Sequence, residues 1–179
     1  MSCLIASFLI YSISSPLQAD RERHREGDDD HRGGHRYRGK KQATAPVNPT
    51  YQNICGGCHF PYPPGLLPTA SWNKIIDRLK DHFGEDIPCD PKEQQEIRIY
   101  LQIYGADRAS WKKSSKIMRS LQGKSPLRIT EVPYIQSKHR KISADVFKRQ
   151  SIGSLSNCRA CHTTADKGDF NDDKVIIPN

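Results

Sequence analysis

Two copies of the pentapeptide Cys-x-x-Cys-His, at residues 55–59 and 158–162, constrain this chain more than any other feature. The pattern is the attachment signature of a c-type haem. Its two intervening residues match the separation of the porphyrin's two vinyl groups, so each sulfur can form a thioether, and the His that follows lies under the iron. The sequence therefore predicts two covalently attached haem c groups. The predicted attachment and proximal residues are Cys55, Cys58 and His59 for the first haem, and Cys158, Cys161 and His162 for the second.

Two other kinds of site use paired cysteines, and neither fits as well. A structural zinc site would not need a His directly after each second Cys. A thioredoxin-like redox pair belongs to a βαβ pattern, and no stretch of this chain alternates like a strand for long. Only 35 % of the residues are hydrophobic, and the mean hydropathy is −0.74. Two large apolar porphyrins would give such a polar chain something to pack around.

The first 45 residues are expected to lie outside the folded part. Residues 1–19 are predicted to be a signal peptide, because a short apolar core ends at Ala19 and a charged stretch follows. No Lys or Arg precedes that core, so a misplaced start or a short membrane anchor is the alternative. Cleavage would place the chain in an oxidising compartment, most simply a bacterial periplasm, with no membrane span left. Residues 20–45, an Arg/His/Asp-rich tail, are expected to be disordered.

The rest of the chain is predicted to be mostly α-helical, with much irregular structure. Helices are expected over residues 71–83, from Asp90 to Gly105, and over residues 110–122 and 132–141. In the first, apolar side chains recur at helical spacing after Ser71, a residue type that caps helix starts. In the second, Asp90 is followed by Pro91 and, three residues on, by Glu93, which is the pattern of a capping box.

The ligand on the second side of each iron separates the possible functions, because an open position favours catalysis or ligand binding and a filled one suits electron transfer. After signal cleavage, the histidines outside the tail and the two motifs are His82 and His139, and the only methionine is Met118. His82 is predicted to bind the first iron, since it falls on the apolar side of an expected helix. His139 is predicted to bind the second, and Met118 to pack in the core. The alternatives are that His82 is an ordinary core histidine and that His139 is an ordinary surface histidine.

Beyond the two motifs, the chain resembles the dihaem cytochrome c family, often called DHC. The resemblance rests on six stretches in order: residues 54–60, 81–85, 128–134, 138–140, 157–162, and 167–173 with 177–178. It implies a first haem lobe like a class I cytochrome c, at residues 46–108, and a less regular second haem lobe, at residues 109–179. It also implies two histidine ligands for both irons, with His82 serving the first haem and His139 the second.

Members of this family are periplasmic electron carriers, in some cases paired with a small oxygen-binding haem protein or a membrane b-type cytochrome. The resemblance therefore implies redox partners of these kinds. Residues 108–149 carry twelve Lys or Arg and two acidic residues. Part of this charge can balance the haem propionates, and the rest favours a basic face that steers an acidic redox partner. A solvated face is the alternative, and a nucleic-acid partner is not expected of a periplasmic haem protein.

The sequence as a whole favours a periplasmic dihaem electron-transfer protein that performs no bond chemistry on a substrate. The alternatives are a dihaem enzyme with one open iron, acting as a peroxidase or a small-ligand reductase, and a haem-based redox or gas sensor. Cys89 is the one cysteine left over after signal cleavage and haem attachment. It is expected to be a small buried residue rather than a reactive thiol.

Overall fold

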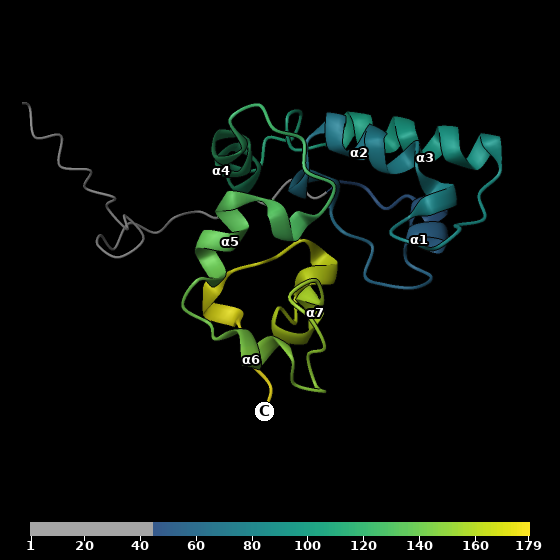
Figure 1. The fold of residues 1–179 in the computed structure, drawn as a ribbon. Helices are drawn as coiled ribbons and strands as arrows, with labels where there is room; N and C mark the ends of the chain where they lie inside the picture. The colour runs from purple at the N-terminus through teal and green to yellow at the C-terminus, as the bar shows by residue number, and fades with distance from the viewer. Residues whose placement is uncertain (1–44) are drawn as a thin grey trace, which may run out of the picture. The chain divides into compact units, whose positions relative to one another are not determined.

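The computed structural model describes residues 45–179 (Figure 1). The predicted signal peptide, and the predicted tail up to residue 44, lie outside the described residues. The α-helices are α1 (Pro49–Cys55), α2 (Thr69–Ile76), α3 (Pro91–Tyr104), α4 (Lys112–Leu121), α5 (Pro133–His139), α6 (Ala144–Phe147) and α7 (Cys158–Cys161). Short 3-10 turns span Pro64–Leu66, Leu79–Asp81, Ile129–Glu131, Ala165–Lys167 and Asp172–Lys174. Residues 45–179 form no β-strand, so the mostly α fold class is confirmed.

None of the helices in the described range combines the length and the apolar character that crossing a membrane requires.

The helix expected from Asp90 has the predicted ends. The Asp90 carboxylate accepts hydrogen bonds from the amides of Lys92 and Glu93, and the Glu93 carboxylate accepts one from the Asp90 amide. Pro91 stands at the first helical position, where no amide hydrogen is needed. Gly105 follows the last helical residue. Both ends of α3 are therefore specified by the residues next to them.

The helix expected over residues 71–83 is shorter than predicted. α2 ends at Ile76, and a 3-10 turn beginning at Leu79 leads the chain to His82, which lies outside any helix. Ser71, expected as the cap, is buried inside α2, and its hydroxyl is without a hydrogen-bond partner in the described structure. A 3-10 turn keeps residues three apart on one side, so Leu79 and His82 still line the same cavity. The apolar period identified the inward-facing side chains and was wrong about the helix beyond Ile76.

The two later helices lie within their expected ranges. α4 lies within the helix expected over residues 110–122. It ends where Gln122 (φ 48°) and Gly123 (φ 82°) adopt left-handed backbone conformations. α5 begins at Pro133 and ends at His139, within the range of 132–141. His139 therefore stands in the last turn of a helix, whereas His82 does not.

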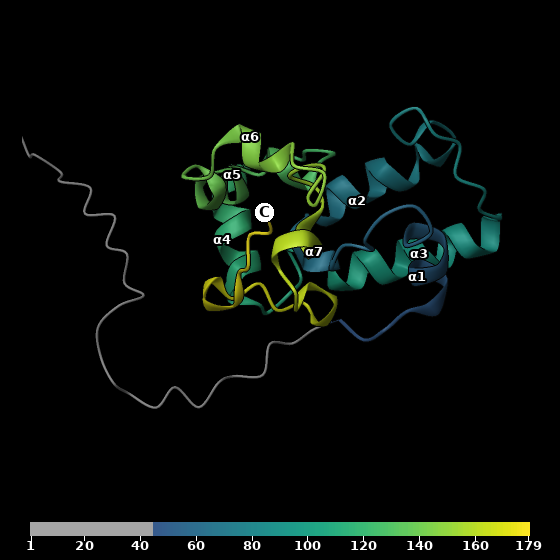
Figure 2. The same ribbon diagram turned by 90° about the horizontal axis from the view of Figure 1, so that it is seen from below.

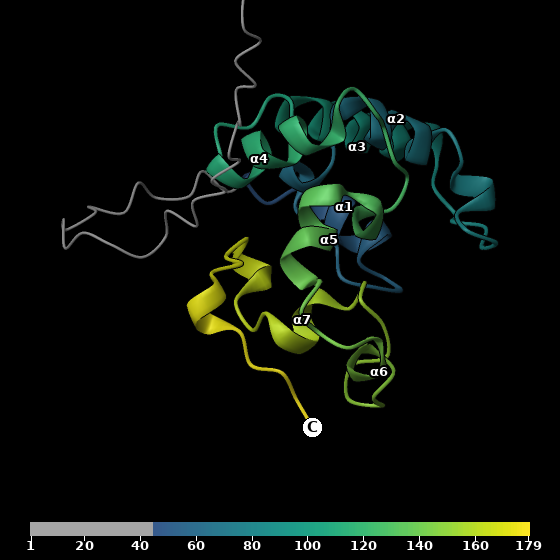
Figure 3. The same ribbon diagram turned by 60° about the vertical axis from the view of Figure 1, so that its left-hand side comes forward.

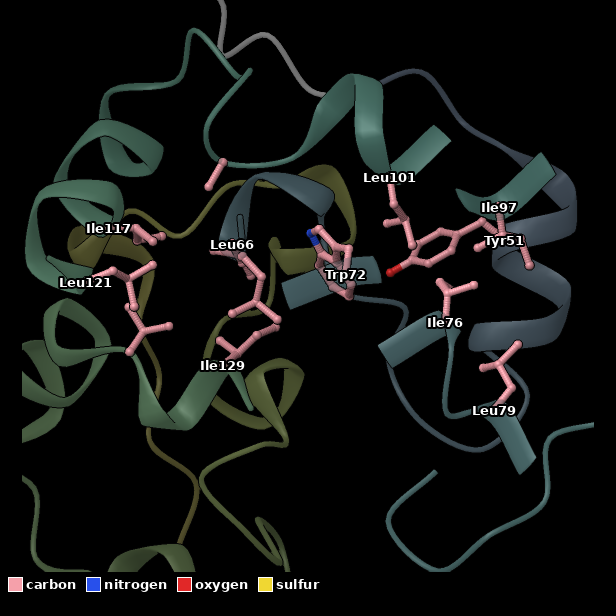
Figure 4. Close-up of a cluster of buried hydrophobic side chains, with 13 residues drawn as sticks. Tyr51, Leu66, Trp72, Ile76, Leu79, Ile97, Leu101, Ile117, Leu121 and Ile129 are labelled. Atoms are coloured by element: carbon pink, nitrogen blue, oxygen red, sulfur yellow. The ribbon is translucent and has the colours of Figure 1, made fainter. Parts of the chain in front are cut away.

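A cluster of buried hydrophobic side chains joins α2, α3 and α4. α2 packs along α3, and α4 packs against α5 (Figures 1, 2 and 3). In Figure 4, Leu66, Trp72 and Ile129 stand between the side chains of α3 and those of α4. The cluster consists of Tyr51, Leu66, Leu67, Trp72, Ile76, Leu79, Ile97, Leu101, Ala106, Ile117, Leu121, Ile129 and Val132. It includes residues of both predicted lobes.

Hydrogen bonds also connect the predicted lobes. Ser114 Oγ, in α4, donates to the carbonyl of Gly65, and Tyr62 Oη donates to the carbonyl of Ser156, both at 2.7 Å. A Cβ atom at residue 65 would lie 2.8 Å from Ser114 Oγ, so this close approach requires glycine. The boundary at residue 108 stays a prediction, and the contacts across it are extensive.

The α3 cap gives a stability prediction. Asp90→Ala should lower the free energy of unfolding by about 1 kcal/mol, because the amides of Lys92 and Glu93 lose their acceptor. Guanidinium unfolding of the haem-loaded protein measures the change. Asp86→Ala, an exposed carboxylate outside the helix, is the control and should change the stability by much less. Equal losses in the two variants would contradict the capping role.

Candidate functional site

One cavity is lined by all eight residues that the sequence singles out for haem binding. Its volume is about 940 Å³, and its walls are largely apolar. That volume is at the upper end of the range for protein ligand pockets, about 300–1,000 Å³. Cys55, Cys58, His59 and His82 line it from the first predicted lobe, and His139, Cys158, Cys161 and His162 from the second. The structure therefore brings each predicted distal histidine to the same cavity as its motif.

The rings of His59 and His82 form a pair in this cavity. Their centres are 6.1 Å apart, and their planes are inclined by 20°. A metal bound between two imidazoles has bonds of about 2.0 Å, and each ring centre lies about 1.1 Å behind its nitrogen, which separates the two centres by about 6 Å. The His59–His82 spacing therefore fits one iron between the rings.

The rings of His139 and His162 form a second pair. Their centres are also 6.1 Å apart, but their planes are inclined by 73°. The two pairs therefore have the spacing that one iron requires and differ in the rotation of one ring against the other. The planes are nearly parallel in the first pair and nearly perpendicular in the second.

One imidazole of each pair is oriented by a backbone hydrogen bond. Nδ1 of His59 lies 2.8 Å from the carbonyl oxygen of Phe60, and Nδ1 of His139 lies 2.8 Å from that of Ile135, one turn earlier in α5. A carbonyl only accepts, so Nδ1 is the donor in both. Nε2 is then the nitrogen without a proton and can bind a metal, which is the usual support for a histidine ligand.

The first motif lies at the end of a short helix. α1 ends at Cys55, and Gly56 follows as its C-cap. A Cβ atom at residue 56 would collide with the carbonyl oxygen of Gln52, so the turn into the motif requires glycine there. Tyr62 lies beyond the motif, with its ring centre 5.2 Å from that of His59.

The second motif forms the single turn of α7 and is supported by the end of the chain. The Ile176 amide donates to the Cys161 carbonyl at 3.0 Å, and Arg149 donates to the Pro178 carbonyl at 2.7 Å. The chain end therefore runs from the motif back towards α6 (Figure 1). The ring of Phe170 lies 5.3 Å from that of His162, so an aromatic side chain borders this pair too.

The thiol environments are apolar. Burial raises the pKa of the Cys55 thiol to about 12, and the neighbouring Cys89 adds to the shift. Burial also raises the pKa of the Cys158 thiol to about 11. Cys89, expected to be a small buried residue, is half-buried and packs against the hydrophobic cluster.

Two half-buried imidazoles are shifted towards the neutral form, which is the form that binds metal. Burial lowers the pKa of His82 and that of His162, and in each case the facing imidazole is the next largest cause. Arg128 beside His82 and Lys113 beside His162 contribute in the same direction. A lowered pKa favours the neutral ring, whose free lone pair a metal requires.

Met118 packs, half-buried, against the hydrophobic cluster and is not among the residues lining the cavity. This agrees with the expectation that it serves the core.

Sequence reasoning missed several residues that border the two histidine pairs. Tyr62 lies beside His59, Arg128 lies near His82, and Lys113 lies near His162, where its Nζ donates to the carbonyl of Phe170. Arg128 begins one of the stretches that carry the family resemblance, but the sequence assigns no role to it, to Tyr62 or to Lys113. They come together only through tertiary folding.

Comparison with known proteins gives a consistent result. Residues 51–170 match the family described as dihaem cytochrome c, which is more than half of the chain. Among curated proteins, none matches.

Solved structures also resemble this chain. A diheme cytochrome c from Rhodobacter sphaeroides is 36 % identical, with a TM-score of 0.63, and the match covers 72 % of this chain and all of that one. A diheme cytochrome type c from Shewanella baltica OS155 is 33 % identical, with a TM-score of 0.61, over 74 % of this chain and 94 % of that one.

The two ring inclinations give a spectroscopic prediction. With each histidine pair bound to one iron, the ferric, haem-loaded protein should show two different low-spin electron paramagnetic resonance signals. Nearly parallel imidazole planes split the two iron d orbitals that bond to the rings and give a rhombic signal, as expected for the His59–His82 pair. Nearly perpendicular planes leave those orbitals close in energy and give a highly anisotropic signal, as expected for His139–His162. Two identical low-spin signals would contradict the difference in ring geometry.

Proposed function

Because this chain belongs to the dihaem cytochrome c family, we propose that it is a periplasmic electron-transfer protein in which each haem has two histidine ligands. Family membership carries the coarser statement, a haem electron-transfer protein with two covalently attached haem c groups. The finer statement is supported chiefly by one observation. Both pairs of facing imidazoles have ring centres 6.1 Å apart, a spacing that fits one iron.

The chain's own residues have three tasks in this proposal. Four cysteines form the thioethers, namely Cys55 and Cys58 for the first haem and Cys158 and Cys161 for the second. His59 and His82 would hold the iron of the first haem, and His139 and His162 that of the second. The largely apolar walls of the cavity would exclude water from a bound porphyrin. The bound haems supply one chemistry, the change of iron between its ferric and ferrous states.

Histidine ligation on both sides favours electron transfer over catalysis. Two imidazoles on one iron leave no position at which a substrate or a gas could bind. A dihaem enzyme or a gas sensor would need one iron with an open position, which a ferric haem reveals by a high-spin spectrum. Low-spin spectra from both ferric haems are therefore the expected result.

The periplasmic location is supported by the sequence pattern of residues 1–19, which has the apolar core and the small residue of a cleavable signal peptide. These residues lie outside the described structure.

The partner in this proposal is an acidic redox protein, of which a membrane b-type cytochrome or a small oxygen-binding haem protein are candidates. Lys138, Arg140 and Lys141 surround His139 in the chain, and their side chains are exposed. We call them the α5 basic surface. Lys138 is paired with Asp172 at 3.2 Å, so Arg140 and Lys141 are the better candidates for contact with a partner. An acidic surface docked there would lie next to the second histidine pair.

Removing each distal histidine should open one iron only. His82→Ala should turn the first ferric haem high-spin and let it bind cyanide rapidly, while the second haem stays low-spin. His139→Ala should have the converse effect. Electron paramagnetic resonance of the ferric variants measures both outcomes and assigns each low-spin signal to its haem.

Met118→Ala is the matched control, and both haems should stay low-spin because Met118 packs in the core. Denaturing mass spectrometry should find two covalent haems in all three variants, since no cysteine is changed. A high-spin haem in the Met118→Ala protein, or none in the histidine variants, would refute the proposed ligands.

The α5 basic surface predicts a salt-dependent reaction with an acidic donor. With photoreduced flavodoxin as the probe, Arg140→Glu/Lys141→Glu should slow the bimolecular reduction at low salt by about tenfold. The difference should shrink at about 1 M salt, where the screening length falls to about 3 Å. Stopped-flow absorbance measures the rate constants. Arg78→Glu/Lys92→Glu makes the same charge change at exposed sites of the first lobe, and an equal slowing there would mean that net charge alone is responsible.

A further inference from the structure

The turn that carries His82 has an unusual backbone. Phe83 has a φ of 59° and Gly84 a φ of 97°, so an aromatic residue occupies the left-handed region, which bulky side chains rarely adopt. Two backbone hydrogen bonds between His82 and Glu85 close the turn, at 2.8 and 3.3 Å, and Asp81 accepts a further bond from the Gly84 amide. A strained conformation persists only where its surroundings hold it, which raises the question of what holds Phe83.

The side chain of Phe83 lies between two partners. On one side, its ring meets that of His82 edge to face, with centres 4.9 Å apart and planes inclined by 65°. On the other, the guanidinium carbon of Arg128 lies 3.9 Å from the centre of the Phe83 ring. His82, Phe83 and Arg128 therefore form a continuous stack, the His82 stack, with a cation at its outer end.

Arg128 reaches this stack from the second predicted lobe. It directly precedes the 3-10 turn Ile129–Glu131, and its amide donates to the Glu131 carboxylate at 3.4 Å. Ile129 next to it belongs to the buried cluster, with 8 % of its surface exposed. The backbone that presents Arg128 is thus anchored in the core, whereas Phe83 remains 46 % exposed.

We propose that Arg128 is a positioning residue for the first haem, holding His82 in place through the ring of Phe83. The inference rests on the proposed ligation of the first iron by His82. A planar guanidinium packs flat on an aromatic ring and is attracted to its electron-rich face. Its contact with Phe83 keeps the strained turn closed, and the closed turn keeps the His82 ring facing His59.

The charge of Arg128 has a second effect, on the reduction potential. A positive charge near an iron favours the ferrous state, which is the less positive of the two. Arg128 therefore raises the potential of the first haem while its shape restrains His82. The two effects are separable, because lysine keeps the charge and lacks the planar group.

The test uses the haem-loaded protein with Arg128→Gln, Arg128→Lys and the control Arg119→Gln. Arg119 is exposed on α4, and its replacement changes the net charge as Arg128→Gln does. Cyanide binding to the ferric protein reports how often His82 leaves the iron. It is followed by stopped flow, with electron paramagnetic resonance showing which low-spin signal is lost. A redox titration gives the two potentials.

Arg128→Gln should accelerate cyanide binding at the first haem by about tenfold. Loss of a residue that supports a metal ligand typically costs about 10- to 100-fold in affinity or activity, and this is the lower end of that range. It should also lower the potential of that haem. Arg128→Lys should accelerate cyanide binding but leave the potential near that of the parent. Arg119→Gln should change neither, and the second haem should be unaffected throughout.

Phe83→Leu tests the stack independently, because it removes the ring and retains Arg128. It should also accelerate cyanide binding, and Phe83→Leu/Arg128→Gln should be no faster than the faster single variant, since residues that act through one contact are not additive. Equal rates in Arg128→Gln and Arg119→Gln, or acceleration at both haems alike, would overturn the role of Arg128. A first haem that is high-spin in the parent would instead overturn the proposed ligation by His82.

Discussion

The distance between two imidazole rings, 6.1 Å in both pairs, is the constraint on which the other features of the sites depend. One ring of each pair directly follows the second Cys of a Cys-x-x-Cys-His motif, so the fold has only to place the other ring. For His139, α5 ends at the required point, and a hydrogen bond to the previous turn orients the ring. For His82, the chain leaves α2 at Ile76 and makes a strained turn. Two unlike local structures thus meet the same requirement.

The parts of the fold that could be predicted from sequence are those specified by neighbouring residues. Asp90 and Gly105 fix the ends of α3 because capping acts over one turn of chain. The two haem motifs were recognisable for the same reason. The spacing of apolar residues up to His82 predicts a helix. That spacing indicates only which side chains face inward, and a 3-10 turn can direct the same side chains inward. Phe83 and Arg128 both lie in stretches that carry the family resemblance, but their contact could not be foreseen, because it joins residues 45 positions apart in the chain.

The contacts between the two predicted lobes make each haem site depend on both halves of the chain. Arg128 covers a residue of the first site, and Tyr62, beside His59, donates to the backbone two residues before Cys158. The close approach of Gly65 to Ser114 adds a buried link. Each site is therefore supported in part by residues of the other predicted lobe.

The burial of one thiol in each motif has a consequence for the maturation of the protein. The reactive form of cysteine is the thiolate, and with pKa values of about 12 for Cys55 and about 11 for Cys158 that form is almost absent at neutral pH once the cavity is closed. The thiols of Cys55 and Cys158 would therefore form thioethers more readily while the chain is still open than after the cavity has closed around them.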